Sequence, residues 1–245
     1  MLPTEVFEKS VRGTSHAYED RTMVDQASRL FAVADGVTRS SQGSGAVAAD
    51  RALMLLQSSF SGNLVAAVYS VHRDMVRLRR EDKAVGETTL TALHIREDDV
   101  AEIANVGDSP CYLLREQELH VLTQFDETPQ GAISQTIGYP EEVEVHRAVV
   151  DLRSGDYLIL ASDGVAHVLN HVVLLPMARG HISAKEVGEA IIERAVATPT
   201  GYDDDKSVIV IRVMDKPPEE PVPLERFLLS NQVPNSSRKS GGKDG

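Results

Sequence analysis

Cysteine is nearly absent from this chain, which has one, Cys111, among 245 residues. A single cysteine cannot form an internal disulfide, and this composition is typical of a reducing cytoplasm. Tryptophan is missing and aromatic residues make up 4% of the chain, so we expect an aliphatic core. No apolar run approaches the ~18 residues that a membrane-spanning helix needs. The N-terminal stretch MLPTEVFEKSVRG also lacks the apolar segment of a signal peptide. We therefore expect a cytoplasmic protein without a membrane partner.

Basic residues are in the minority as well, because 25 Lys and Arg stand against 37 Asp and Glu, giving a formal net charge of −12. A surplus of negative charge argues against nucleic acid or an anionic membrane as the main partner. It fits a soluble protein, or one that gathers carboxylates to hold cations. The length allows one large domain or two small ones.

Apolar residues at helical spacing predict two consecutive helices. One runs from Ala49 to Phe60 behind the N-cap candidate Ser44, and the other runs from Leu64 to Leu78. The Gly-Asn pair at 62–63 separates them, so we expect a helical hairpin. The spelling SAKE at 183–186 is that of a capping box and predicts a third helix.

Strands are predicted in eight short apolar segments, which cover residues 29–34, 88–95, 100–106, 110–115, 118–122, 143–150, 156–161 and 207–213. Many follow one another without a helix between them, so we expect antiparallel pairing. The element order predicts an α+β protein with two sheets covered by helices. After Val213 the sequence turns Pro-rich and then polar. We predict one domain over 1–213 and a linker with a polar C-terminal tail over 214–245.

Acidic residues stand where several predicted strands end. The stretches FAVADG at 31–36 and LILASDG at 158–164 are both apolar runs that close on Asp-Gly. Glycine after the aspartate lets the backbone turn and lets its carbonyl approach a ligand closely. Further acidic residues follow or precede other strands, namely Glu19, Asp20, Asp108 and the triplet Asp203, Asp204 and Asp205.

These carboxylates have two interpretations. Taken singly, Asp-Gly is a common turn and an acidic triplet is usually a solvated loop. Taken together, rigid strand ends that each present a carboxylate can converge on one site, and hard divalent cations such as Mg²⁺ and Mn²⁺ prefer oxygen ligands. The order and the repeated context favour a cation site.

Several motifs together resemble the metal-dependent Ser/Thr protein phosphatases of type 2C, the PPM family, in its bacterial form. FAVADGV at 31–37 resembles the family's first Asp-Gly strand, and NVGDS at 105–109 resembles its N-x-G-D-S motif. GDYLILASDG at 155–164 resembles G-D-x-L-L-L-x-S-D-G, and DDKS at 204–207 resembles D-N-x-T before the last strand. These matches run in family order from about residue 12 to residue 213.

The resemblance implies an αββα sandwich of two mainly antiparallel sheets, with a dinuclear Mg²⁺ or Mn²⁺ site at one end. In this chain it implies that Asp35 bridges both metals and that the carbonyl of Gly36 binds one of them. It implies that Asp163 and Asp204 bind the other metal.

Three more positions follow from the same resemblance. Glu19 and Asp20 stand where the family has Glu-Asp, which implies that they hold metal-bound waters. Asp108 matches the position that helps a third, weaker metal. The implied reaction is attack of a metal-bound hydroxide on phosphoserine or phosphothreonine of a protein, reversing a Ser/Thr kinase. Asp20, Asp35, Asp163 and Asp204 are the implied catalytic carboxylates.

The sequence departs from the family pattern at a few positions. Ser15 stands where an arginine usually grips the phosphate, and Arg12 or Arg39 is our candidate substitute for substrate binding. Asp205 stands where asparagine is usual, which adds a negative charge. The segment 123–142, the expected flap beside the site, lacks the usual Asp-His pair.

Two alternatives stay open. The missing arginine suits a pseudophosphatase that binds a phosphopeptide or partner without turnover, whereas retention of the acidic positions argues against it. A phosphatase for small phosphorylated molecules is also compatible, because the metals bind the phosphoryl group and not the leaving group.

Overall fold

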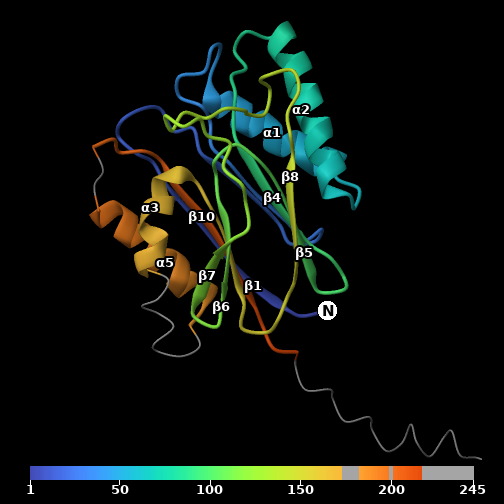
Figure 1. The fold of residues 1–245 in the computed structure, drawn as a ribbon, viewed down its shortest axis with the longest axis vertical. Coiled ribbons are helices and arrows are strands. Elements are labelled where there is room, and N and C mark those ends of the chain that lie inside the picture. The colour runs from blue at the N-terminus through green and yellow to red at the C-terminus, as the bar shows by residue number, and fades with distance from the viewer. Residues whose placement is uncertain (173–181, 199–200, 217–245) are drawn as a thin grey trace, which may run out of the picture.

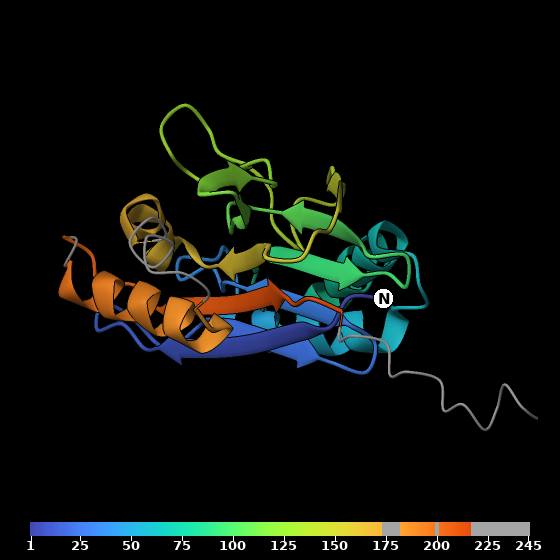
Figure 2. The same cartoon turned by 90° about the horizontal axis from the view of Figure 1, so that it is seen from below.

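The computed structural model describes residues 1–172, 182–198 and 201–216, and these form two stacked five-stranded sheets (Figures 1 and 2). The strand orders are β1-β10-β9-β6-β7 and β2-β3-β4-β5-β8, and every pairing is antiparallel. The strands are β1 (Thr4–Val11), β2 (Arg21–Asp25), β3 (Leu30–Ala34), β4 (Leu90–Ile95), β5 (Val100–Val106), β6 (Cys111–Arg115), β7 (Glu118–Val121), β8 (His146–Asp151), β9 (Tyr157–Ala161) and β10 (Lys206–Val213).

Two helix pairs cover the outer faces of these sheets, on opposite sides of the molecule (Figure 2). Helices α1 (Gly45–Ser59) and α2 (Leu64–Glu81) pack on the sheet that contains β3 and β4. Helices α3 (Asp163–Val172) and α5 (Ala184–Ala197) pack on the sheet that contains β9 and β10. The layers confirm the predicted αββα sandwich.

The buried core is aliphatic, as the composition predicts. On β3, Phe31 and Val33 face the other sheet while Ala32 and Ala34 face the helix pair α1 and α2, so all five residues of the strand are buried. This alternation follows from the two-residue period of a strand. Each fully buried Val, Leu, Ile, Phe or Met side chain stabilises the fold by about 1.5–3 kcal/mol. Cys111 lies in the same core, where burial raises the pKa of its thiol.

The helix starts follow from their capping residues. Ser44 accepts from the Val47 N–H at the start of α1, and Asn63 accepts from the Ala66 N–H at the start of α2. At α5, Ser183 and Glu186 form both bonds of the predicted capping box. Each bond satisfies a backbone group that the helix itself leaves unpaired.

Two strands and one helix are missing from the predicted segments given above. Strands β1 and β2 show only intermediate burial along most of their length, so neither carries the alternation of more and less exposed residues that the edge strand β8 has. Helix α3 begins directly at Asp163, where the Asp-Gly pair reads as a turn. Some boundaries also move, since the strand predicted at 143–150 is His146–Asp151. Most of the predicted linker and tail lies outside the described residues. No helix among the described residues is long and apolar enough to cross a membrane.

Candidate metal centre

The first Asp-Gly pair is fixed by the strand next to it. The Asp35 N–H donates to the Thr89 hydroxyl at 2.9 Å, and the Asp35 carbonyl accepts from the Thr89 N–H at 2.8 Å and from the Thr88 hydroxyl at 2.9 Å. Gly36 leaves no room for a side chain, because an added Cβ would stand 2.4 Å from the Gly45 backbone. The end of β3 therefore presents Asp35 in one orientation at the start of α1.

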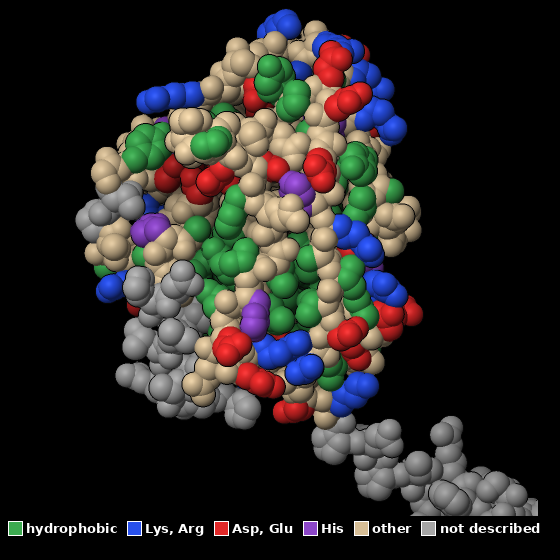
Figure 3. Space-filling view, viewed as in Figure 1, with side chains coloured by type: hydrophobic (Ala, Val, Ile, Leu, Met, Phe, Trp, Pro, Cys, Tyr) green, Lys and Arg blue, Asp and Glu red, His purple; other side chains and the backbone are tan. Residues whose placement is uncertain are grey.

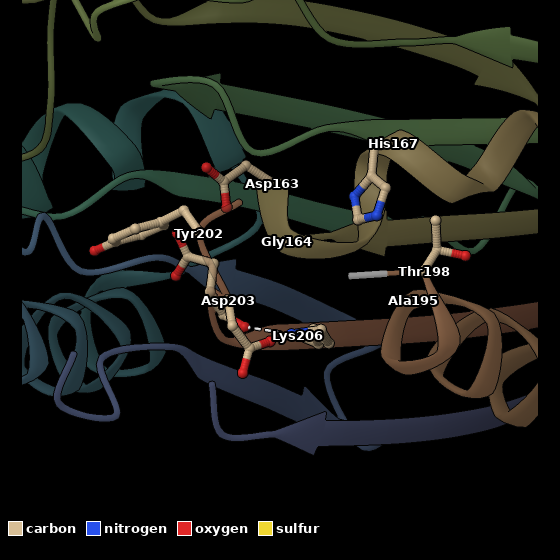
Figure 4. Close-up of a pocket in the computed structure, with 9 residues that line it drawn as sticks. Asp163, Gly164, His167, Ala195, Thr198, Tyr202, Asp203 and Lys206 are labelled. Atoms are coloured by element: carbon tan, nitrogen blue, oxygen red, sulfur yellow. Dashed lines mark hydrogen bonds and ion pairs between the residues drawn. The ribbon is translucent and has the colours of Figure 1, made fainter. Parts of the chain in front are cut away.

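The second Asp-Gly pair opens α3. Asp163 is exposed to solvent, and an added Cβ on Gly164 would stand 1.9 Å from the carbonyl oxygen of Asp205. Only glycine permits this approach, which brings Asp163 beside the acidic triplet. In Figure 4, Asp163 faces Tyr202 and Asp203 across a pocket of about 270 Å³ that Asp204 also lines. Figure 3 shows acidic side chains gathered in the hollow beside α3.

The acidic triplet does not form a solvated loop. Asp203 accepts from the Thr14 N–H at 3.0 Å and the Thr14 hydroxyl at 2.7 Å, and its other carboxylate oxygen lies 2.6 Å from the Lys206 Nζ. The Asp203 N–H donates to the Ser15 hydroxyl at 2.8 Å. This aspartate joins the segment before Glu19 to the start of β10.

Asp205 has a different partner set. Its buried carboxylate accepts from the backbone N–H groups of Gly13 at 2.8 Å, Glu19 at 2.6 Å and Asp20 at 3.3 Å. The carboxylate that stands in place of the usual asparagine therefore accepts hydrogen bonds from three backbone N–H groups. It holds the chain that presents Glu19 and Asp20.

Asp20 and Glu19 are buried with unsatisfied oxygens. Asp20 is 1% exposed, and neither of its carboxylate oxygens has a hydrogen-bond partner among the described residues; the Glu19 Oε2 atom is in the same condition. Burial, helped by the charges of Asp205 and Asp163, raises the pKa of Asp20 to about 7 against the opposing effect of the nearby Ser162 and Ser207 hydroxyls. An ionised carboxylate buried in this way is destabilising unless it takes up a proton or a cation or a water fills the space.

Asp35 lies among these carboxylates. Desolvation raises its pKa well above the usual range, and the charges of Asp20, Asp163, Asp204 and Asp108 act in the same direction. Asp108, on the turn after β5, has a pKa raised to about 7, chiefly by burial and then by Asp163. The fold thus brings the predicted acidic positions together, where they repel one another unless positive charge is added.

The arrangement fits divalent cations in its donor chemistry and in its orphaned oxygens. Among the described residues, however, no three acidic, histidine or cysteine side chains stand in a complete ligand set. Closely spaced carboxylates without a counter-charge repel one another, so a complete ligand set is not expected without the ion. The metal roles of Asp35, Gly36, Asp163, Asp204, Asp20, Glu19 and Asp108 stay predictions.

The predicted phosphate-binding residues make no hydrogen bond or ion pair with the described acidic residues. Arg12 and Arg39 are both exposed, and neither has a hydrogen-bond or ion-pair partner among the described residues. The predicted flap is anchored instead by Asp126, which accepts from the Gly107 N–H and lies 2.7 Å from the His146 Nε2. This contact fixes the turn that carries Asp108.

One residue at the site escaped the sequence analysis. The His16 Nε2 lies 2.5 Å from the Asp204 Oδ1, and its Nδ1 lies 2.5 Å from the Ala17 carbonyl. Burial acts to lower the pKa of His16, but the hydrogen bonds to Asp204 and Ala17 outweigh it, and the pKa is raised. No sequence spacing identifies a lone histidine as part of a site. His16 reaches the site only through its contact with Asp204, which lies at the other end of the domain sequence.

The pKa values predict how the stability of the metal-free protein changes with pH. A carboxyl whose folded pKa exceeds its unfolded value stabilises the fold at low pH, and that contribution is lost as pH rises through the folded pKa. Asp20 and Asp108 both have pKa values of about 7, raised from 3.8. In EDTA, we expect the free energy of unfolding to be larger at pH 6 than at pH 8 by about 2–3 kcal/mol.

Urea unfolding at the two pH values measures this difference. The double variant Asp20→Asn with Asp108→Asn should show a smaller dependence, because both titrating groups are gone. A wild-type stability that stays constant or rises from pH 6 to pH 8 would contradict the prediction.

Comparison with known proteins agrees with the resemblance to phosphatases found in the sequence. The family model described as Stage II sporulation protein E (SpoIIE) matches residues 63–214. Protein phosphatase PhpP of Streptococcus pneumoniae is 28% identical over 151 residues, covering 54% of this chain and 60% of that protein. Stage II sporulation protein E of Bacillus subtilis is 24% identical over 153 residues, covering 59% of this chain and 17% of that protein. The chain thus matches about 60% or less of the length of these relatives.

The solved structures agree with the observed sandwich. The catalytic domain of the serine threonine protein phosphatase PstP, solved in complex with two manganese ions, superposes with a TM-score of 0.73 and 26% identity. That match covers 88% of this chain and all of the PstP chain. Stp1 from Staphylococcus aureus, at 19% identity and a TM-score of 0.73, shares the fold. With a matching family model over more than half of its length and this sandwich, the chain belongs to the SpoIIE family of PPM-type phosphatase domains.

Proposed function

We propose that this protein is a metal-dependent phosphatase that hydrolyses phosphoserine and phosphothreonine on proteins. The observation that carries the proposal is Asp20, whose two carboxylate oxygens are buried beside a cluster of like charges and make no hydrogen bond of normal geometry among the described residues. Such a carboxyl is either protonated, which its raised pKa allows below about pH 7, or kept ionised by a cation or cation-bound water beside it. The manganese ions in the related PstP catalytic domain support the same conclusion.

The residues divide into those that would hold the ions directly and those that would hold them through water. Asp35, the Gly36 carbonyl, Asp163 and Asp204 form the first group. The second group is Glu19 and Asp20, with Asp108 beside a third and weaker ion. When bound, Mg²⁺ or Mn²⁺ would lower the pKa of a water molecule and neutralise charge on the phosphoryl oxygens.

The chain itself supplies rigidity and access. Asp35 and Asp20 are fixed by backbone hydrogen bonds to the Thr89 and Asp205 side chains. Asp163 is exposed toward the pocket, so a phosphorylated residue can approach from that side. Arg12 and Arg39 are exposed and unpaired among the described residues, so either side chain is available to contact a phosphate.

The biological setting follows as part of the proposal. The substrate would be a cytoplasmic protein phosphorylated by a paired Ser/Thr kinase, and the reaction would reverse that signal. The alternative of a pseudophosphatase gains no support from the comparisons, because the matched relatives include proteins named phosphatases. Small phosphate esters remain a second substrate class to be tested directly.

The test is phosphate release from a phosphothreonine peptide in the presence of Mn²⁺, Mg²⁺ or EDTA. We expect turnover with a divalent cation and none with EDTA. An aryl phosphate assayed in parallel distinguishes peptide preference from general ester hydrolysis. Loss of Arg12 or Arg39 to alanine should raise the KM for the peptide. Folded protein without turnover under any metal condition would overturn the proposal.

A further inference from the structure

We propose that His16 is a positioning residue that holds Asp204 in the orientation in which it binds a metal ion. The inference rests on the proposed function, because it assigns a partner to one of the proposed metal ligands. It starts from the contact between His16 and Asp204, which is shorter than the 3.4 Å contact of the His16 Nδ1 with the Glu19 Oε2.

The ring of His16 is locked on three sides. The Nδ1 atom lies 2.5 Å from the Ala17 carbonyl and the Nε2 atom lies 2.5 Å from the Asp204 carboxylate. Both neighbours are acceptors, so both ring nitrogens donate and the ring is in its imidazolium form. The Tyr202 ring stacks on the imidazole with centroids 5.7 Å apart and planes 17° apart. The side chain is 6% exposed. The ring can therefore present its Nε2 atom in only one direction, toward Asp204.

Asp204 needs such support because of its place in the chain. Asp35 continues a buried strand and is paired with the adjoining Thr88 and Thr89, whereas Asp204 lies in the irregular segment before β10 begins at Lys206. Its backbone carbonyl accepts from the Lys206 Nζ at 2.6 Å, which fixes the main chain but leaves the side-chain angles open.

The hydrogen bonds to Asp204 are one-sided. Its Oδ1 atom faces the His16 Nε2 at 2.5 Å and accepts from the Asp205 N–H at 2.8 Å. No described residue pairs with Oδ2, and the carboxylate lines the pocket that Asp163 also lines. The protein thus holds the Oδ1 atom by hydrogen bonds, and the Oδ2 atom remains available to bind a cation. Outer partners of this kind orient metal-binding carboxylates, and their loss typically weakens metal binding about 10–100-fold.

Three substitutions separate the contacts of His16. His16→Gln places an amide N–H near the position of Nε2 and keeps a donor for Asp204. His16→Asn places its amide near Nδ1, so it keeps a partner for the Ala17 carbonyl and loses Asp204. His16→Phe keeps the stacking on Tyr202 and loses both hydrogen bonds. His120→Asn is the matched control, because His120 is an exposed residue of β7.

The measurement is the dissociation constant for Mn²⁺ by calorimetry, with thermal unfolding in EDTA recorded for each variant. We expect the Asn and Phe variants to bind Mn²⁺ about 10–100-fold more weakly, and the Gln variant and the control to stay within about threefold of wild type. Recovery by Gln is the result that a merely structural histidine would not give.

Two results would overturn the inference, and they differ in meaning. If wild type binds Mn²⁺ and His16→Asn binds it equally well, the positioning role fails while the proposed function stands. The same holds if all three variants lose affinity only in proportion to a lost thermal stability. If wild type binds neither Mn²⁺ nor Mg²⁺, the proposed function fails, and the inference fails with it.

Discussion

Asp35→Asn is expected to abolish phosphate release and, in the same protein, to raise the melting temperature measured in EDTA. Activity falls while stability rises, because the Asp35 carboxylate supports catalysis when metal is bound and destabilises the fold when it is not. For a bound metal it is the predicted bridging ligand, whose loss removes several kcal/mol of transition-state stabilisation. That corresponds to a loss of turnover of about a thousandfold or more.

Without metal, the same carboxylate destabilises the fold. Desolvation and the charges of four neighbouring aspartates already raise the pKa of Asp35. A neutral amide of equal size relieves that repulsion, so we expect a gain of about 1–3 kcal/mol. For a chain of this length the melting temperature should rise by about 2–4 °C for each kcal/mol.

Phosphate release with Mn²⁺ and differential scanning calorimetry in EDTA measure the two effects. Asp163→Asn should behave in the same way for activity. Asp98→Asn is the matched control, since Asp98 is an exposed residue paired with Arg96 in the turn after β4. An Asp35→Asn protein that keeps its turnover would refute the metal-ligand assignment, whereas a lower melting temperature in EDTA would refute the account of the repulsion.

Asp205→Ala is expected to give the largest loss of stability of any single aspartate substitution at the site. The alanine leaves the N–H groups of Gly13, Glu19 and Asp20 without their acceptor in a buried region. Each unsatisfied buried donor costs about 1–3 kcal/mol, so we expect a total of about 3–5 kcal/mol. The segment that presents Glu19 and Asp20 would lose its attachment to β10, so metal affinity should fall as well.

Urea unfolding in EDTA checks this expectation without interference from bound metal. Asp205→Asn keeps one acceptor oxygen and should lie between wild type and Asp205→Ala. The neighbouring Asp203→Ala serves as the control, because its carboxylate is more exposed and its loss should be smaller. If the Asn variant were as stable as wild type in EDTA but bound Mn²⁺ weakly, Asp205 would be a metal ligand and not a backbone anchor.

Much of the fold could be predicted because its signals are local. The spacing of apolar residues in α1 and α2, the capping box at Ser183 and the buried run before Asp35 each act within a few residues. The edge strands β1 and β2 have no such signal, since neither presents a fully buried face. The acidic positions could be predicted because strand ends carry them and the family order repeats them.

The sequence by itself determined the αββα class, the family and the acidic residues that face one another at the site. Only the tertiary structure decided how those residues are supported. Asp205 accepts from backbone N–H groups near residue 13. His16 holds Asp204, although the two residues are 188 positions apart in the sequence. Such contacts exist only after β1 and β10 pair, since that pairing brings the ends of the domain together. Periodicity and spacing act over a few residues, so no local pattern can record them.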